Sequence, residues 1–85
     1  MRDVKRILDS ILEGCNIQFS EKALNDLQEY LDKLVGETPC AGLHPDTLAT
    51  IKFGLEFWGM NNISADCMLP PEFVKRFLEA YCAKD

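Results

Sequence analysis

Length, composition and charge define one small globular domain and exclude several classes of protein. The chain has 85 residues, of which 47% are hydrophobic and 27% are charged. This composition provides enough apolar surface for one folded core and excludes a disordered chain. The formal net charge of −5 argues against a protein that coats nucleic acid and predicts that charged partners are basic.

The sequence also lacks the usual membrane and secretion signals. No stretch reaches the ~20 apolar residues of a membrane span, and the first residues lead into an amphipathic helix instead of a signal peptide. We therefore expect one domain over residues 1–85, no membrane or nucleic-acid partner, and an intracellular, cytoplasmic location. The chain has four cysteines, Cys15, Cys40, Cys67 and Cys82, which could form two disulfides in three possible pairings. In a reducing cytoplasm we expect all four to be reduced thiols.

The first predicted helix begins near Asp3 and ends at Gly14. Its apolar residues follow the i, i+3, i+4, i+7 spacing of a single helix face: Val4, Ile7, Leu8, Ile11 and Leu12. Gly14 can adopt the left-handed backbone that ends many helices. Ile17 and Phe19 are large apolar residues in the short turn that follows, so we expect both to pack on the core.

The second predicted helix runs from Ser20 to Gly36. The Ser20 hydroxyl can accept a hydrogen bond from an unpaired amide of the first turn, and Gly36 can end the helix. One face is apolar and predicts the buried side: Ala23, Leu24, Leu27, Tyr30, Leu31, Leu34 and Val35.

Residues 44–60 form the predicted central helix, on which the other segments pack. Pro45 suits a first helical turn, and Gly59 supplies a possible stop. Large apolar residues fall on two opposite faces, one with Leu48, Ile51, Leu55 and Trp58, the other with Ala49, Phe53, Phe57 and Met60. Residues 51–57 also alternate in the period of a strand, which leaves a β-strand as the alternative.

The last predicted helix has Pro71 and Glu72 in its first turn and is followed by a frayed end. Its apolar face consists of Phe73, Val74, Phe77, Leu78 and Tyr81. Four helices joined by loops predict an all-α domain, either a compact four-helix bundle or an irregular orthogonal helical array.

The segment from residue 3 to residue 35 resembles the first half of a histone fold, with a helix, a short extended turn, a serine cap and a second helix. The resemblance ends there, since Gly36, Pro39 and Pro45 interrupt what would be a long middle helix. We therefore carry over no DNA-binding residue from that family.

Residues that could support catalysis or metal binding are few. Cys40 and His44 lie four residues apart and could act as nucleophile and base, or as two zinc ligands completed by Cys67 and Cys82. A zinc site is usually marked by paired C-x-x-C motifs, and the sequence has none. No glycine-rich phosphate loop and no convergent carboxylate pair is apparent. We expect no metal, no cofactor and no catalytic residue, and therefore no enzyme.

The surplus of large apolar residues on the central helix points to a protein-interaction module. If Trp58 lies in the core, the opposite face with Phe53, Phe57 and Met60 is left for a partner, which would be another protein or a second copy of this chain. Burial of both faces within the monomer is the alternative that this pattern leaves open.

A second hypothesis starts from the outer face of the second helix. Asp26, Glu29 and Asp32 form an acidic patch at helical spacing. Such a patch could imitate nucleic acid and inhibit a basic protein, although it is also typical of an ordinary solvated helix face.

Overall fold

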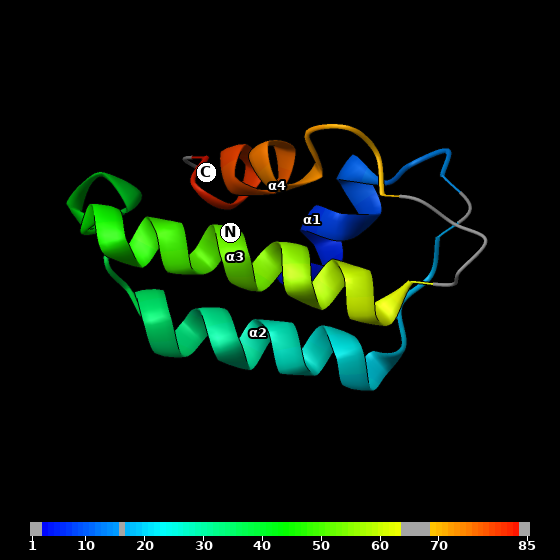
Figure 1. Cartoon of the computed structure of the whole chain (residues 1–85), viewed down its shortest axis with the longest axis horizontal. Coiled ribbons are helices and arrows are strands. Elements are labelled where there is room, and N and C mark those ends of the chain that lie inside the picture. The colour runs from blue at the N-terminus through cyan, green and yellow to red at the C-terminus, as the bar shows by residue number, and fades with distance from the viewer. Residues whose placement is uncertain (1–2, 16, 64–68, 84–85) are drawn as a thin grey trace.

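A computed structural model describes residues 3–15, 17–63 and 69–83 of the chain, and these ranges contain helices and no strand. The elements are α1 (Val4–Ile11), α2 (Glu21–Val35), a single 3₁₀ turn η1 (Cys40–Gly42), α3 (Pro45–Asn62) and α4 (Phe73–Tyr81). Figure 1 shows α2 and α3 side by side, with α4 lying along the other side of α3 and α1 running steeply across them. The prediction of an all-α domain is confirmed.

The first two helices begin at the residues that the sequence predicted. The Asp3 carboxylate accepts hydrogen bonds from the backbone amides of Lys5 at 3.0 Å and Arg6 at 3.4 Å, and the Ser20 hydroxyl accepts from the amide of Ala23 at 3.1 Å. These bonds satisfy amides that have no partner within their own helix. Gly36 ends α2 with a positive φ of 58°, a conformation that side chains disfavour.

The central segment is a helix throughout, so the strand alternative for residues 51–57 is wrong. Pro45 is the first helical residue, and the His44 side chain caps it by accepting a hydrogen bond from the Asp46 amide at 3.1 Å. The helix continues through Gly59 to Asn62. With 18 residues α3 is the longest helix, yet neither it nor any other helix in the described ranges is long and apolar enough to cross a membrane.

Gly59 does not end α3 as predicted but makes room for another segment. It is buried, and a Cβ atom built on it would lie 2.5 Å from Leu69 Cδ1. The segment that leads into α4 therefore lies close against the backbone of α3. The helix α4 starts at Phe73, two residues later than predicted from Pro71, because Glu72 adopts a left-handed φ of 62°.

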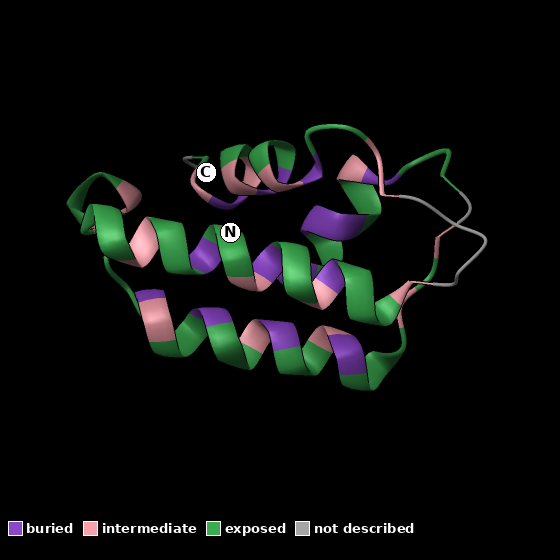
Figure 2. Cartoon of the chain, in the orientation of Figure 1, coloured by how far each residue is buried: buried purple, intermediate pink, exposed green. Residues whose placement is uncertain are grey.

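The four helices surround one core. Each packs against its neighbours in sequence, and α4 closes the ring on α1. The buried residues recur about once per turn along α2, as the colouring of Figure 2 shows. The core consists of Val4, Ile7, Leu8, Leu12, Leu27, Leu31, Val35, Ile51, Leu55, Phe73, Phe77 and Tyr81.

Side chains outside the helices complete this core. Ile17 and Phe19 pack against it as expected, and the Phe19 ring lies 4.4 Å from the Trp58 ring, measured between centroids. Within α2, the polar residue Gln28 is half-buried, and its side-chain oxygen accepts a hydrogen bond from the Val4 backbone amide at 2.9 Å. This bond ties the start of α1 to α2.

The prediction of reduced cysteines is wrong for two of the four. Cys40 in η1 and Cys82 at the end of α4 form a disulfide, with Cα atoms 5.7 Å apart. The fold brings the connection between α2 and α3 against the last turn of α4. Because the two cysteines are 42 residues apart in the sequence, their spacing did not predict this contact. Cys15 is an exposed free thiol, and Cys67 lies outside the described residues.

The disulfide predicts a measurable difference in stability. Replacing both Cys40 and Cys82 by serine should lower the free energy of unfolding by about 2 to 4 kcal/mol, because the unfolded chain regains the freedom of a long loop. Cys15→Ser is the control and should change it by less than about 0.5 kcal/mol, since Cys15 is exposed. Urea unfolding without reductant measures both values. Equal stability of the double variant and the unmodified protein would contradict the bridge.

Candidate functional site

Three large apolar side chains of α3 lie on the surface. Phe53, Phe57 and Met60 are 75%, 72% and 75% exposed. Their spacing of i, i+4, i+7 places them on one face of the helix, and we call these three residues the apolar stripe. The opposite face of α3 carries the buried residues Ile51, Leu55 and Gly59. The core thus uses one apolar face of α3 and leaves the other in contact with solvent.

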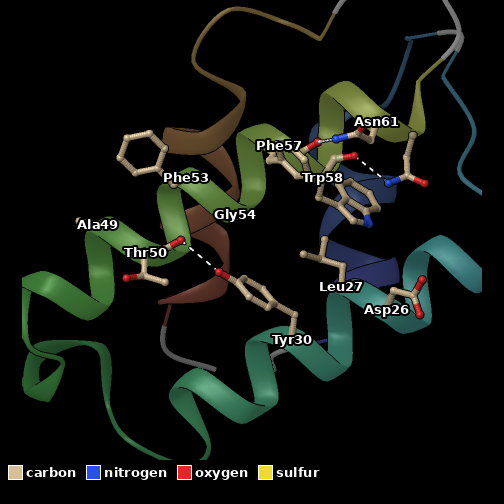
Figure 3. Close-up of a pocket in the computed structure, with 11 residues that line it drawn as sticks. Asp26, Leu27, Tyr30, Ala49, Thr50, Phe53, Gly54, Phe57, Trp58 and Asn61 are labelled. Carbon is tan, nitrogen blue, oxygen red and sulfur yellow. Dashed lines mark hydrogen bonds between the residues drawn. The ribbon is translucent and has the colours of Figure 1, made fainter.

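A groove runs beside the stripe, between α2 and α3. It has a volume of about 730 Å³ and is open to solvent, and its surface is overwhelmingly apolar. Figure 3 shows the side chains that line it, which include Phe53 and Phe57 of the stripe. Along α2 they are Asp26, Leu27 and Tyr30, and along α3 they are Ala49, Thr50, Phe53, Gly54, Phe57, Trp58, Asn61 and Asn62. We call this feature the α2–α3 groove.

Met60 lies on the far side of the stripe from this groove. It borders a second hollow of about 420 Å³ together with Leu69, Pro70 and Phe73, near the start of α4. The stripe is therefore a ridge between two hollows, with Phe53 and Phe57 on the groove side. A partner that covered the whole stripe would contact α2, α3 and the beginning of α4.

Tyr30 and Gly54 form the middle of the groove, and sequence reasoning assigned neither of them to the site. The Tyr30 hydroxyl donates to the Thr50 carbonyl oxygen at 3.2 Å, as Figure 3 shows. A Cβ atom on residue 54 would lie 2.5 Å from the Tyr30 ring, so this ring packs directly over the bare α3 backbone. The glycine inside a helix pattern was the available signal, since such a glycine often marks a close approach.

Trp58 forms one wall of the groove and joins it to the core. The prediction placed this side chain in the core, but it is half-buried. Its ring packs against Phe19 on one side, and its indole Nε1–H donates to the Ala23 carbonyl oxygen at 3.0 Å. Trp58 is the only tryptophan of the chain, so its fluorescence reports on whatever enters the groove.

The C-terminal end of the groove is polar. The side-chain amide nitrogens of Asn61 and Asn62 donate to the carbonyl oxygens of Phe57 and Trp58, at 2.7 and 2.8 Å. Both bonds run back along the last turn of α3. They leave the side-chain carbonyl oxygens of the two asparagines at the end of the groove, where they can accept hydrogen bonds from a partner.

The acidic patch of α2 is largely engaged within its own helix. Lys22 donates to Asp26 at 2.8 Å, and the neighbouring carboxylate raises the pKa of this lysine. Lys33 Nζ lies 3.4 Å from Glu29 Oε1, and the Asp32 carboxylate accepts a hydrogen bond from the side-chain amide nitrogen of Gln28 at 3.0 Å. Two of the three carboxylates thus have a cation beside them, which weakens the field that the patch can present.

Cys40 and His44 are not arranged for chemistry. The Cys40 sulfur belongs to the disulfide, so it is neither a nucleophile nor a zinc ligand in this state. The His44 Nδ1 accepts the capping hydrogen bond of α3. Within the described residues, no group of three or more His, Cys, Asp or Glu side chains could hold a metal ion.

Comparisons of the chain with known protein families, characterised proteins and solved structures find no match. The apolar stripe and the α2–α3 groove are therefore the features from which a function can be inferred.

The contact between Tyr30 and Gly54 predicts an energetic coupling. Gly54→Ala alone should leave the free energy of unfolding almost unchanged, because a helix gain of about 1 kcal/mol is offset by displacement of the Tyr30 ring and loss of its hydrogen bond. In a Tyr30→Ala background the same change should stabilise by about 1 kcal/mol. Chemical denaturation of the four proteins measures this coupling.

Tyr30→Phe separates the ring from the hydroxyl. It keeps the ring over the backbone but has no hydrogen bond to lose, so Gly54→Ala should give a gain in this background that lies between those in the unmodified protein and in Tyr30→Ala. An equal gain in all three backgrounds would show that Tyr30 does not rest on Gly54.

Proposed function

We propose that this protein is a non-enzymatic interaction module, an adaptor, inhibitor or assembly subunit, which binds another protein through the apolar stripe and the α2–α3 groove. The observation that carries the proposal is the exposure of Phe53, Phe57 and Met60 beside an apolar groove. Contiguous apolar surface bordered by polar residues is typical of a protein interface. Large side chains of this kind commonly dominate binding energy.

The exposure has no evident role in folding. The core is complete without the stripe, since α3 already contributes Ile51 and Leu55 to it. Covering one phenylalanine side chain gains about 1.5 to 3 kcal/mol relative to leaving it in water. A partner that covered Phe53 and Phe57 would therefore gain much of the energy that a stable complex needs.

The shape of the site favours a macromolecule over a small ligand. Pockets for small molecules enclose most of the ligand and place a few polar groups to orient it. The α2–α3 groove is open and the stripe projects beside it, so a small molecule would remain largely in water. A second protein can fill the groove and cover the stripe together.

The acidic mimic ranks below this proposal. Its candidate residues Asp26, Glu29 and Asp32 have partners within α2. Ion pairs between exposed side chains reduce the charge that a basic partner would meet. The apolar stripe also has no role in a mimic that binds by charge alone.

The disulfide bears on where the module acts. A bridge between Cys40 and Cys82 is maintained in oxidising compartments and is uncommon in the reducing cytoplasm. We therefore propose that the binding-competent form is the oxidised one. A cytoplasmic location remains a prediction from the sequence alone.

The double variant Phe53→Asp, Phe57→Asp tests the proposed function. It should stay folded, because both side chains are on the surface, and it should lose a partner that the unmodified protein captures from its native host. Circular dichroism and thermal unfolding measure folding, and quantitative mass spectrometry of the captured proteins measures binding.

The control is the double variant Gln18→Asp, Asn25→Asp, which adds the same two charges at exposed polar positions outside the groove. It should capture the same proteins as the unmodified chain. Unfolding of the phenylalanine variant would show that these side chains belong to the core. Unchanged capture would place the interface elsewhere.

A further inference from the structure

The charge of the chain is concentrated on the half that carries the groove. Residues 21–62 hold seven carboxylates and three lysines, a net charge of −4, whereas the rest of the chain contributes −1 to the total of −5. The carboxylates of this half are Glu21, Asp26, Glu29, Asp32, Glu37, Asp46 and Glu56, and its lysines are Lys22, Lys33 and Lys52. The apolar site thus lies within an acidic field.

Two acidic side chains lie close to the apolar stripe and, unlike Asp26 and Glu29, form no ion pair with a lysine of their own helix in the structure. Asp46 is one helical turn before the Ala49 end of the groove, and its side chain is 95% exposed. Glu56 lies on α3 beside Met60, in the hollow on the far side of the stripe. Asp26 also lines the groove, but Lys22 is bound to it at 2.8 Å, so its charge is partly compensated. A partner that covers the stripe therefore meets negative charge chiefly from Asp46 before the Ala49 end of the groove and from Glu56 on the far side of the stripe.

The form of the groove suits an α-helix. It follows α3 from Ala49 to Asn62, which at 1.5 Å per residue is about 20 Å, the length of three to four helical turns. Two helices that lie side by side form a straight groove between them, and a third helix can place its side chains in this groove. The ridge formed by Phe53 and Phe57 can in turn pack between the side chains of the third helix. The described residues offer no strand edge for an extended peptide to pair with.

From these observations we infer that the partner presents a basic amphipathic helix. Its apolar residues at i, i+3 or i+4 and i+7 lie in the α2–α3 groove, and lysine or arginine on its flanks faces Asp46 and Glu56. The inference rests on the proposed function and adds to it the class of ligand. Apolar contact supplies the affinity in this arrangement, and the acidic flanks select the charge of the partner.

The same charges disfavour the two other occupants of an apolar surface. A second copy of the chain would bring two surfaces of net charge −4 together, which costs energy at low salt. An anionic lipid surface would be repelled for the same reason. Neither offers the acidic flanks an opposite charge.

A selection experiment tests this inference without a known partner. A phage library of random 20-residue peptides is selected on the immobilised, oxidised protein and counter-selected on the Phe53→Asp, Phe57→Asp variant. Because the variant is more acidic, it removes peptides that bind by charge alone. The enriched peptides should combine the helical apolar spacing with a net positive charge.

Titration of tryptophan-free enriched peptides, followed by Trp58 fluorescence, then gives the affinity. Replacing the lysines and arginines of a peptide by glutamine should weaken binding about tenfold at 50 mM salt and much less at 500 mM. In the protein, Asp46→Asn with Glu56→Gln should weaken binding several-fold. The control Glu79→Gln, at an exposed position of α4 outside the groove, should not.

The outcomes separate this inference from the proposed function. Enrichment of neutral or acidic peptides that still require Phe53 and Phe57 would overturn the basic helix and leave the interaction surface standing. Enriched proline-rich or extended sequences would do the same. The basic helix is also overturned if no peptide is enriched, or if light scattering shows a dimer at low salt that depends on the stripe. In both cases the capture experiment with the Phe53→Asp, Phe57→Asp variant decides the proposed function by itself.

Discussion

The structure depends on one packing constraint: α3 is apolar on two opposite faces, and the domain has a single core. Ile51 and Leu55 lie at the centre of that core, in contact with residues from the surrounding helices. Helices α2 and α4 pack against α3 and bury this side of it, and they leave the other side uncovered. Phe53, Phe57 and Met60 consequently stay in water. The candidate site is therefore the apolar face of the central helix that no other helix covers, and the function of this site depends on which partner covers it.

Two glycines set the position of α3 between its neighbours. Gly54 lets the Tyr30 ring of α2 lie on the helix backbone, and Gly59 lets Leu69 approach from the α4 side. The hydrogen bond from Trp58 to the Ala23 carbonyl holds the indole ring against α2. The Tyr30–Gly54 contact and the Trp58 hydrogen bond thus form part of the α2–α3 groove from residues that also join α2 to α3, whereas the Gly59–Leu69 contact joins α3 to the segment before α4. The site is therefore held by the fold itself, as a preformed binding surface requires.

Local rules predicted the parts of this structure that depend on neighbours in sequence. Asp3, Ser20, Gly36 and Pro45 act at helix ends, where a side chain within three residues decides the outcome. The periodicity of α3 placed Ile51 and Leu55 on one face and Phe53 and Phe57 on the other, and the packing decided that the second face stays exposed. Gly59 was misjudged because its function is a contact with Leu69, ten residues later. The disulfide and the Tyr30–Gly54 contact join segments 42 and 24 residues apart, and no spacing rule reports them. The groove could not be predicted for the same reason, since it exists only between two packed helices.

The central claim is that the second face of α3 is exposed in the free protein, and hydroxyl-radical footprinting with mass spectrometry tests it most directly. The five phenylalanines of the chain serve as internal probes. Labelling at low micromolar concentration should be fast at Phe53 and Phe57 and at least tenfold slower at Phe73 and Phe77, which are buried. Equal protection of all four rings at every concentration would show that the monomer buries both faces of α3, and the interaction surface would not exist.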